Sequence, residues 1–205
     1  MRYESDHKER TRQRVLTEAA AAIRAVGPDG IGVAGVMAKA GLTHGAFYAH
    51  FESKDDLIAQ AISLMFAEAY QKFLARTVDL DPMAALSNYF DMYLSTRHRD
   101  APQSGCPLPS LSGEIARLPP AARTRFADGL KALTASIAKR IEQLGLPAPE
   151  RLAASVVSEM VGALALSRTV EDPAESEQIL KSTREALKAR LSIPTGHGAQ
   201  LVKGA

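Results

Sequence analysis

Aromatic side chains and cysteine are scarce in this 205-residue chain. Aromatic residues make up 5% of it, tryptophan is absent, and there is one cysteine, Cys106. A single cysteine excludes an intrachain disulfide and any metal site built from a cysteine cluster. It also suits a reducing compartment. The fold therefore depends on its apolar core, for which 46% hydrophobic residues are ample.

Long hydrophobic runs are also missing. No segment approaches the roughly 20 consecutive apolar residues that a membrane-spanning helix needs. The N-terminal sequence MRYESDHKERTRQRV lacks the apolar centre of a secretory signal. We therefore expect a cytoplasmic protein with no membrane partner.

Net charge is small as well. The formal charge is +2, and positive and negative side chains nearly balance within the first 55 residues. A balance of this kind does not by itself indicate nucleic-acid binding. A hypothesis of DNA binding has to depend on where the charges lie.

Catalytic motifs are not found either. The chain has no Gly-x-Ser-x-Gly, no phosphate-binding glycine loop and no His-Glu-x-x-His. Cys106 lacks a defined histidine partner for nucleophilic catalysis. His44 and His50 have no acidic or thiol neighbour at metal-ligand spacing. We predict no enzymatic activity, no cofactor and no metal.

What the chain does contain is helical periodicity along most of its length, which predicts an all-α fold of about nine helices. Asp81 before Pro82 and Ser53 are expected N-caps. We expect an irregular link at 101–109. The expected helices cover residues 7–26, 33–40, 43–51, 54–75, 82–98, 111–117, 119–144, 150–170 and 175–191.

The few aromatic residues concentrate in GLTHGAFYAHFESKDDL, residues 41–57. Two short helices joined by a turn at Gly41, with Thr43 as the second N-cap, predict a helix-turn-helix over 33–51. Gly41 suits the positive φ that ends many helices. Phe47 and Phe51, four residues apart, are expected to face the core.

Residues 11–62 closely resemble the N-terminal domain of TetR/AcrR family transcriptional regulators. The run AGLTHGAFYAHFESKDDL carries the family pattern AG-x-(S/T)-x-(G/A)-x-x-Y-x-(H/Y)-F-x-x-K-x-x-L. The resemblance implies a three-helix, helix-turn-helix DNA-binding domain at 1–53 and a larger helical ligand-binding and dimerisation domain at 54–193. Residues 194–205 are expected to form a flexible tail. Gly32 departs from the family, which often has Ser or Thr at that cap.

The resemblance also implies a DNA-binding surface. Thr43, Tyr48 and Lys54 are expected to contact backbone phosphates, with Arg10 and Thr11 near a neighbouring phosphate. The base edges are assigned to His44, Gly45 and Ala49, with His50 suited to either role. Small or polar residues on this face let the helix backbone approach the major groove.

A homodimer is expected, because one reading head covers only half of a palindromic operator. Small residues in the last two helices permit close helix approach between subunits, which we favour, or within one chain. They are Ala153, Ala154, Gly162, Ala163, Ala165 and Ala186.

A pocket for a small-molecule effector requires apolar and aromatic residues with a few polar groups. Every candidate also suits an ordinary core. The candidates are Met65, Phe66, Phe90, Met92, Tyr93, Cys106, Leu108, Leu111, Phe126, Met160 and Leu164.

These observations indicate a DNA-binding transcriptional regulator, with a repressor released by an effector as the favoured form. One alternative is a regulator whose Cys106 senses oxidants or electrophiles, with Arg97, His98 and Arg99 as nearby basic residues. We favour Cys106 as a small buried hydrophobe. The other alternative is a DNA-binding dimer without an effector.

Overall fold

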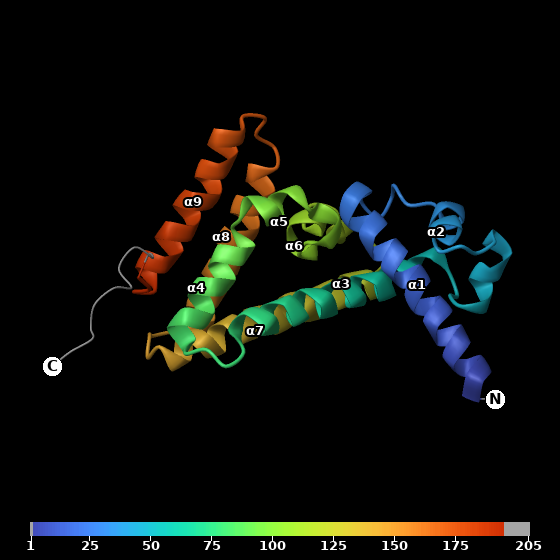
Figure 1. Cartoon of the computed structure of the whole chain (residues 1–205), viewed down its shortest axis with the longest axis horizontal. Helices are drawn as coiled ribbons and strands as arrows, with labels where there is room; N and C mark the ends of the chain where they lie inside the picture. Colours follow the sequence, from blue (N-terminus) through green and yellow to red (C-terminus); the bar gives the residue numbers. More distant parts are fainter. Residues whose placement is uncertain (1, 195–205) are drawn as a thin grey trace. The chain divides into compact units, whose positions relative to one another are not determined.

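A computed structural model describes residues 2–194, with side chains from residue 6 onward. Within that range the chain forms nine α-helices and three 3₁₀ helices and no strand, which confirms the all-α prediction (Figure 1). The expected tail lies, from residue 195 on, outside the described residues. The elements are α1 (Arg2–Val26), α2 (Val33–Lys39), η1 (His44–Ala49), α3 (Lys54–Thr77), α4 (Pro82–Tyr93), α5 (Thr96–Asp100), η2 (Pro102–Ser104), α6 (Pro107–Leu111), η3 (Ile115–Arg117), α7 (Pro120–Gln143), α8 (Pro149–Ser167) and α9 (Pro173–Arg190).

None of the helices in the described part of the chain is long and apolar enough to span a bilayer. Two compact units divide the chain. The first unit comprises Met1–Phe73 and Ala101–Leu133, and the second comprises Leu74–Asp100 and Thr134–Ala205. Helices α3 and α7 therefore contribute residues to both units. The domain boundary expected between residues 53 and 54 falls inside the first unit.

The first unit is organised around α1, which packs against α2, η2 and α6. Val15, Ala19 and Ile23 are fully buried along one face of α1, at the three- to four-residue spacing of an amphipathic helix. The helix begins five residues earlier than the periodicity predicted. Helix termini are the least certain part of such a prediction, because the first turn of a surface helix buries little.

Among the described side chains of this unit, one that carries a charge is buried. Arg24 is 5% exposed, and its guanidinium donates to Glu68 Oε2 at 2.6 Å and to the Met65 carbonyl at 3.4 Å. A further hydrogen bond, of 3.3 Å, reaches the carbonyl of Gln103. Burying this charge is tolerable because α3 and η2 supply the acceptors. The side chain ties α1 to both elements.

The second unit is built from α4, α8 and α9, with α4 packed against the other two (Figure 1). Lys188 on α9 is 5% exposed, and its ammonium lies 2.7 Å from each carboxylate oxygen of Asp91 on α4. Ala153 and Ala163 are buried within the unit. Packing within the chain therefore accounts for those two small residues, whereas Ala154 and Ala186 are exposed.

Several predicted helix starts are confirmed by their caps. Asp81 accepts hydrogen bonds of 3.0 Å from the amides of Met83 and Ala84. Ser53 Oγ accepts one of 3.1 Å from the amide of Asp56. Asp172 also caps a helix, α9, by accepting from the amides of Ala174 and Glu175. These short polar side chains satisfy amides that have no partner inside the helix.

The single helix expected over residues 82–98 was wrong. α4 ends at Tyr93, Leu94 leaves helical geometry at φ −95° and ψ 52°, and α5 begins at Thr96. Ser95 Oγ accepts from the amide of His98 at 3.2 Å and so caps the new helix. A local cap thus competed successfully with continuation of the helix.

The segment after α5 is more ordered than predicted. The expected irregular link at 101–109 contains η2 and the start of α6, and the helix expected at 111–117 is replaced by η3. Pro107 takes the first position of α6, where proline is tolerated because that amide needs no helical partner. The expected second helix of the helix-turn-helix is likewise shorter, a 3₁₀ helix at His44–Ala49.

Candidate nucleic-acid interface

The turn between α2 and η1 fixes how η1 leaves the first unit. Gly41 has φ of 70°, the left-handed geometry predicted for it. Its amide donates to Ala38 O at 3.0 Å, and the Leu42 amide donates to Met37 O at 2.9 Å. This pair of bonds closes the end of α2 and reverses the chain within a few residues.

Phe47 and Phe51 anchor the inner face of η1. Each is 2% exposed, and their rings stack at a centroid distance of 5.6 Å. This confirms the prediction that both face the core. Because these rings hold one side of η1 inward, the opposite side faces solvent.

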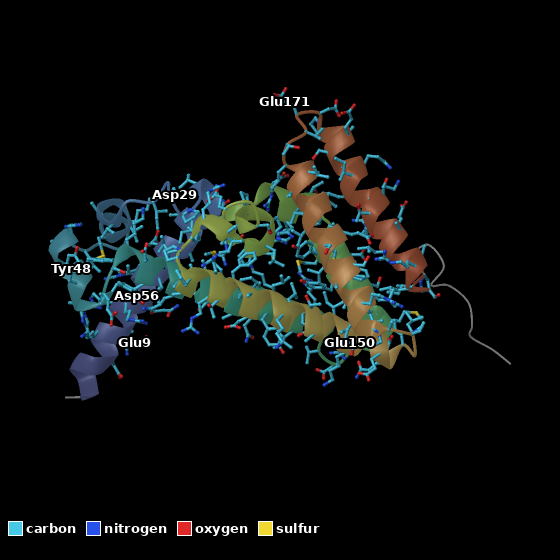
Figure 2. The ribbon with its side chains drawn as sticks, turned by 180° about the vertical axis from the view of Figure 1, so that it is seen from behind. Glu9, Asp29, Tyr48, Asp56, Glu150 and Glu171 are labelled. Atoms are coloured by element: carbon cyan, nitrogen blue, oxygen red, sulfur yellow. The ribbon has the colours of Figure 1, made fainter. Side chains whose placement is uncertain are left out.

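The outward side carries the residues that the sequence assigned to DNA. Tyr48 is 73% exposed and projects from the outer edge of the first unit (Figure 2). Its ring packs edge-on against Phe47 at 5.2 Å. A methyl group added at Gly45 would meet nothing within 4 Å, so the backbone is open there. The exposed members of the predicted set are Thr43, His44, Gly45, Tyr48 and Ala49.

Thr43 takes the predicted N-cap position but does not cap. Its backbone is extended, at φ −77° and ψ 151°, yet its hydroxyl makes no capping hydrogen bond. The expectation of a side-chain cap is wrong, because η1 is a tight 3₁₀ helix whose amides close locally, as in the bond from Ala46 N to Thr43 O at 3.1 Å.

His50 differs from its neighbours because it is only half exposed. Its Nδ1 atom is buried without a hydrogen-bond partner in the described structure. Burial lowers the pKa of His50 below its usual value of 6.5, and the nearby cations Lys8 and Arg12 lower it further. Glu9 opposes this shift more weakly, and the net effect favours the neutral imidazole.

Lys54 is the first residue of α3 and is half exposed. It lies directly after the Ser53 cap, at the positive end of the helix dipole. On α1, Arg10 is exposed whereas Thr11 is 7% exposed. Of that pair, Arg10 has the side chain that is accessible to a phosphate.

The candidate pocket residues are divided between the two units. Met65, Phe66, Cys106, Leu108, Leu111 and Phe126 belong to the first unit, and Phe90, Met92, Tyr93, Met160 and Leu164 belong to the second. All are buried except Met92, which is half buried. In the first unit Phe66 and Phe126 meet edge-on at 5.5 Å. Burial alone suits a core and a pocket equally.

Cys106 is 5% exposed, which agrees with a small buried hydrophobe. Its expected basic neighbours, residues 97–99, belong to the second unit, whereas Cys106 belongs to the first. Lys72 on α3 is a cation that interacts electrostatically with the thiol. Among the described residues no group of three or more histidine, cysteine or acidic side chains is placed to hold a metal.

Sequence reasoning missed a polar connection between α1 and α3. Arg12 donates to the side-chain oxygen of Gln60, and Gln60 donates to Asp56 Oδ1 at 2.7 Å. Arg12 and Gln60 are 48 residues apart. No local pattern indicates such a pair, because each residue taken alone suits a solvent-facing helix position.

Two family models match the chain. Residues 15–61 match the model described as bacterial regulatory proteins, tetR family, and residues 82–183 match that of the tetracyclin repressor-like C-terminal domain. Together they take in most of the sequence. No curated protein matches it.

Solved structures match over nearly the whole fold. The reduced form of NemR from E. coli is 19% identical, with a TM-score of 0.79 and coverage of 90% of this chain and 99% of that one. A TetR transcriptional regulator from Chloroflexus aurantiacus is 23% identical, with a TM-score of 0.79 and coverage of 91% and 96%. At these identities the likeness concerns the fold alone.

Proposed function

Since the chain belongs to the tetR family of bacterial regulatory proteins and is a DNA-binding transcriptional regulator, we propose that it is a homodimeric repressor that a small-molecule effector releases from a palindromic operator. The observation that carries this proposal is the outward face of η1. That face is exposed, small or polar, and held in place by two buried phenylalanines. A surface of this kind lets a helix backbone come close to base edges.

The roles of the individual residues follow from their chemistry. We assign His44, Gly45 and Ala49 to base edges, because a ring nitrogen can bond to a base and the small residues allow close approach. Thr43, Tyr48 and Lys54 are assigned to backbone phosphates, with His50 suited to either contact. Phosphate contacts set the register of the protein on the duplex, whereas base contacts set the sequence preference.

The dimer is assigned to α8 and α9 of the second unit. Ala154 and Ala186 are exposed, Gly162 and Ala165 are half exposed, and Leu166 is 59% exposed. Exposed small and apolar residues on adjacent helices suit the helix-on-helix contact of a bundle shared by two subunits. Two such subunits would present two η1 elements to the half-sites of one palindrome.

The effector is a small molecule held by buried apolar and aromatic side chains. Half-sites lie about 34 Å apart, or a multiple of that distance. An effector that binds better to a dimer with another separation of its η1 elements would therefore shift the population away from the DNA-bound form. We expect no catalytic activity, no resident cofactor and a cytoplasmic location.

Selection of bound duplexes from a random DNA pool tests the proposal. Purified dimer should enrich a palindromic site, and the recovered duplex then serves to screen small molecules for release. Failure to enrich any sequence at low salt, with a folded dimer confirmed by sedimentation, would count against DNA binding by this chain alone.

The two alternatives make different predictions in the same screen. If the Cys106 thiol senses oxidants or electrophiles, they should release DNA from the wild type but not from Cys106→Ser. Burial lowers the pKa of Lys72, the charge of the Cys106 thiolate raises it to a smaller extent, and this coupling is the reason for testing it. An effector-independent dimer would bind the duplex and respond to no compound.

A further inference from the structure

A relay of side chains connects α1 to the segment that follows η1. Arg12 Nη2 donates to Gln60 Oε1, and Gln60 Nε2 donates to Asp56 Oδ1 at 2.7 Å. Asp56 Oδ2 accepts a hydrogen bond of 3.2 Å from the backbone amide of Glu52. In Figure 2 the labels Glu9 and Asp56 mark the two helices, α1 and α3, that the relay joins.

Each member of this relay has a defined direction of hydrogen bonding. Arg12 can only donate, and an ionised Asp56 can only accept. Gln60 lies between them and can do both, because its amide has one acceptor oxygen and one donor nitrogen. A carboxylate at position 60 would still accept from Arg12, but it would face Asp56 with like charge.

Arg12 has further contacts that hold it in place. Its guanidinium carbon lies 5.4 Å from the centroid of the Phe51 ring, within the range of a cation–π contact. Nη1 lies 3.8 Å from Glu9 Oε1, and the side chain is 28% exposed. Phe51 in turn stacks on Phe47 of η1. The same guanidinium therefore touches both the core that anchors η1 and the relay that reaches Glu52.

The relay ends at the short connection between the predicted DNA-contacting elements. Residues 50–53 separate η1, which carries Tyr48, from α3, which begins at Lys54. Ser53 Oγ accepts from the Asp56 amide at 3.1 Å, while the Asp56 carboxylate accepts from the Glu52 amide. These reciprocal bonds fix the connection from both sides, as in a capping box shifted by one residue.

We propose that Arg12, Gln60 and Asp56 are positioning residues for DNA binding. They set the spacing between Tyr48 and Lys54 by holding residues 50–53, and Arg12 acts through Gln60 instead of neutralising a phosphate itself. This inference rests on the proposed function, because the two positioned side chains are those assigned to phosphates. The hydrogen bonds of the relay are present in the free protein and do not depend on DNA.

A swap of hydrogen-bond directions tests the relay. Gln60→Glu removes the donor to Asp56, and Asp56→Asn leaves one oxygen to serve both Gln60 and the Glu52 amide. The double variant restores every bond, because the asparagine introduced at position 56 donates through its amide nitrogen and accepts from the Glu52 amide through its oxygen. The glutamate introduced at position 60 accepts from that nitrogen and from Arg12. Net charge in the double variant equals that of the wild type.

Binding to the selected duplex is the first readout, by fluorescence anisotropy under conditions where circular dichroism shows every variant folded. Each single variant should bind at least about fivefold more weakly, and the double variant should return to within about twofold of wild type. If the fold-loss of DNA affinity in the double variant equals the product of the two single losses, the relay is overturned. Single variants that bind like wild type would do the same.

A comparison with Arg12→Met separates positioning from direct contact. If Arg12 acts through Gln60, the slope of log K against log salt should change equally in Arg12→Met and Gln60→Met. The variant that combines Arg12→Met with Gln60→Met should then lose no more affinity than either single variant. A direct phosphate contact would instead lower the Arg12→Met slope by about 0.9 more for each phosphate that Arg12 had neutralised. That result would overturn the assigned role.

Hydrogen exchange of the free protein tests the relay without DNA. Exchange of the Glu52 amide should accelerate in each single variant and slow again in the double variant, while amides of α8 stay unchanged. Failure of the wild type to bind any duplex would reject the proposed function but leave this readout intact. Unchanged exchange at Glu52 in both single variants would reject the relay itself.

Discussion

At the scale of single residues, the exposed side of η1 is determined by the side chains that point the other way. Phe47 and Phe51 are buried at 2% exposure each, and Tyr48 between them is 73% exposed. The hydroxyl of such an exposed tyrosine is accessible for a hydrogen bond to a bound molecule.

Tyr48→Phe and Lys54→Ala should weaken binding to all sequences alike, because phosphate contacts carry no base information. For Lys54→Ala the slope of log K against log salt should fall by about 0.9 for each phosphate left unneutralised, hence about 1.8 for a dimer. Titration of labelled duplexes at several salt concentrations measures both effects. Lys181→Ala, an exposed change on α9, is the matched control. A weaker affinity at one operator variant only would contradict a phosphate role.

His44→Ala should change which bases are preferred. His44 is exposed at the start of η1, where its ring can reach a base edge. A wrong or unrecognised base pair typically costs about 1–3 kcal/mol. Repeating the duplex selection with the variant measures the change. Recovery of the same consensus with the same tolerance would remove His44 from the base-reading set.

His50 should make the stability of the protein depend on pH. Burial first, and then Lys8 and Arg12, lower the pKa of His50 in the folded state below its usual 6.5. As pH falls, the unfolded chain therefore protonates at His50 before the folded protein does. The free energy of unfolding is full above about pH 6.5 and declines as pH drops toward the folded-state pKa of His50. Urea unfolding at pH 7.5 and 5.5 should show a smaller decline for His50→Gln. An equal decline in both proteins would contradict the assignment.

At the scale of elements, the Phe66 ring of α3 packs directly onto α7 in the first unit because one position of α7 lacks a side chain. A Cβ atom at Gly129 on α7 would lie 2.2 Å from the Phe66 ring of α3. That ring is confined, since Phe126 meets it edge-on at 5.5 Å. Glycine in the middle of a long helix costs about 0.5–1 kcal/mol relative to alanine, and here the close approach of the ring explains its presence.

Gly129→Ala should therefore destabilise the protein. Overpacking of this kind costs about 1–3 kcal/mol, which exceeds the gain in helix propensity. Gly35→Ala in α2 is the matched control, because nothing lies within 4 Å of its added Cβ, and it should stabilise by about 0.5–1 kcal/mol. Urea unfolding measures both. Similar shifts in the two variants would mean that the Phe66 ring moves aside without cost.

At the scale of the whole molecule, the proposed function requires two copies of the chain. The second unit already satisfies much of its own packing, through Ala153 and Ala163 inside it and through the pair between Lys188 and Asp91. Small residues of α8 and α9 that stay accessible, among them Gly162, are those available to a second subunit.

Gly162→Leu should weaken dimerisation without unfolding the subunit. Nothing lies within 4 Å of an added Cβ at Gly162, so a side chain can begin there without a clash in one subunit, and leucine would obstruct close approach of another. An overpacking cost of about 1–3 kcal/mol corresponds to a roughly 5- to 150-fold weaker dimer. Sedimentation equilibrium measures the change, with the exposed Ala135→Leu of α7 as control. Equal dimer affinity in both variants would move the interface away from Gly162.

The fold could be predicted largely from the sequence where the determining contacts are local. The periodicity of α1, the caps at Ser53 and Asp81 and the glycine turn at Gly41 all depend on residues within a few positions of one another. Such contacts repeat wherever the same short pattern occurs, which is why the helix-turn-helix and its outward residues were recognisable. Their roles in DNA binding remain predictions.

Only the tertiary structure decided the contacts between residues far apart in the chain. Arg12 with Gln60, Arg24 with Glu68, and Gly129 with Phe66 each join positions that no local pattern relates. The break after Tyr93 and the 3₁₀ form of η1 were also missed. At both places a local hydrogen bond, from the His98 amide to Ser95 Oγ and from the Ala46 amide to the Thr43 carbonyl, competes with the regular α-helix that the periodicity favours. Short-range preferences thus determined which helices form, and long-range packing determined how their side chains are held.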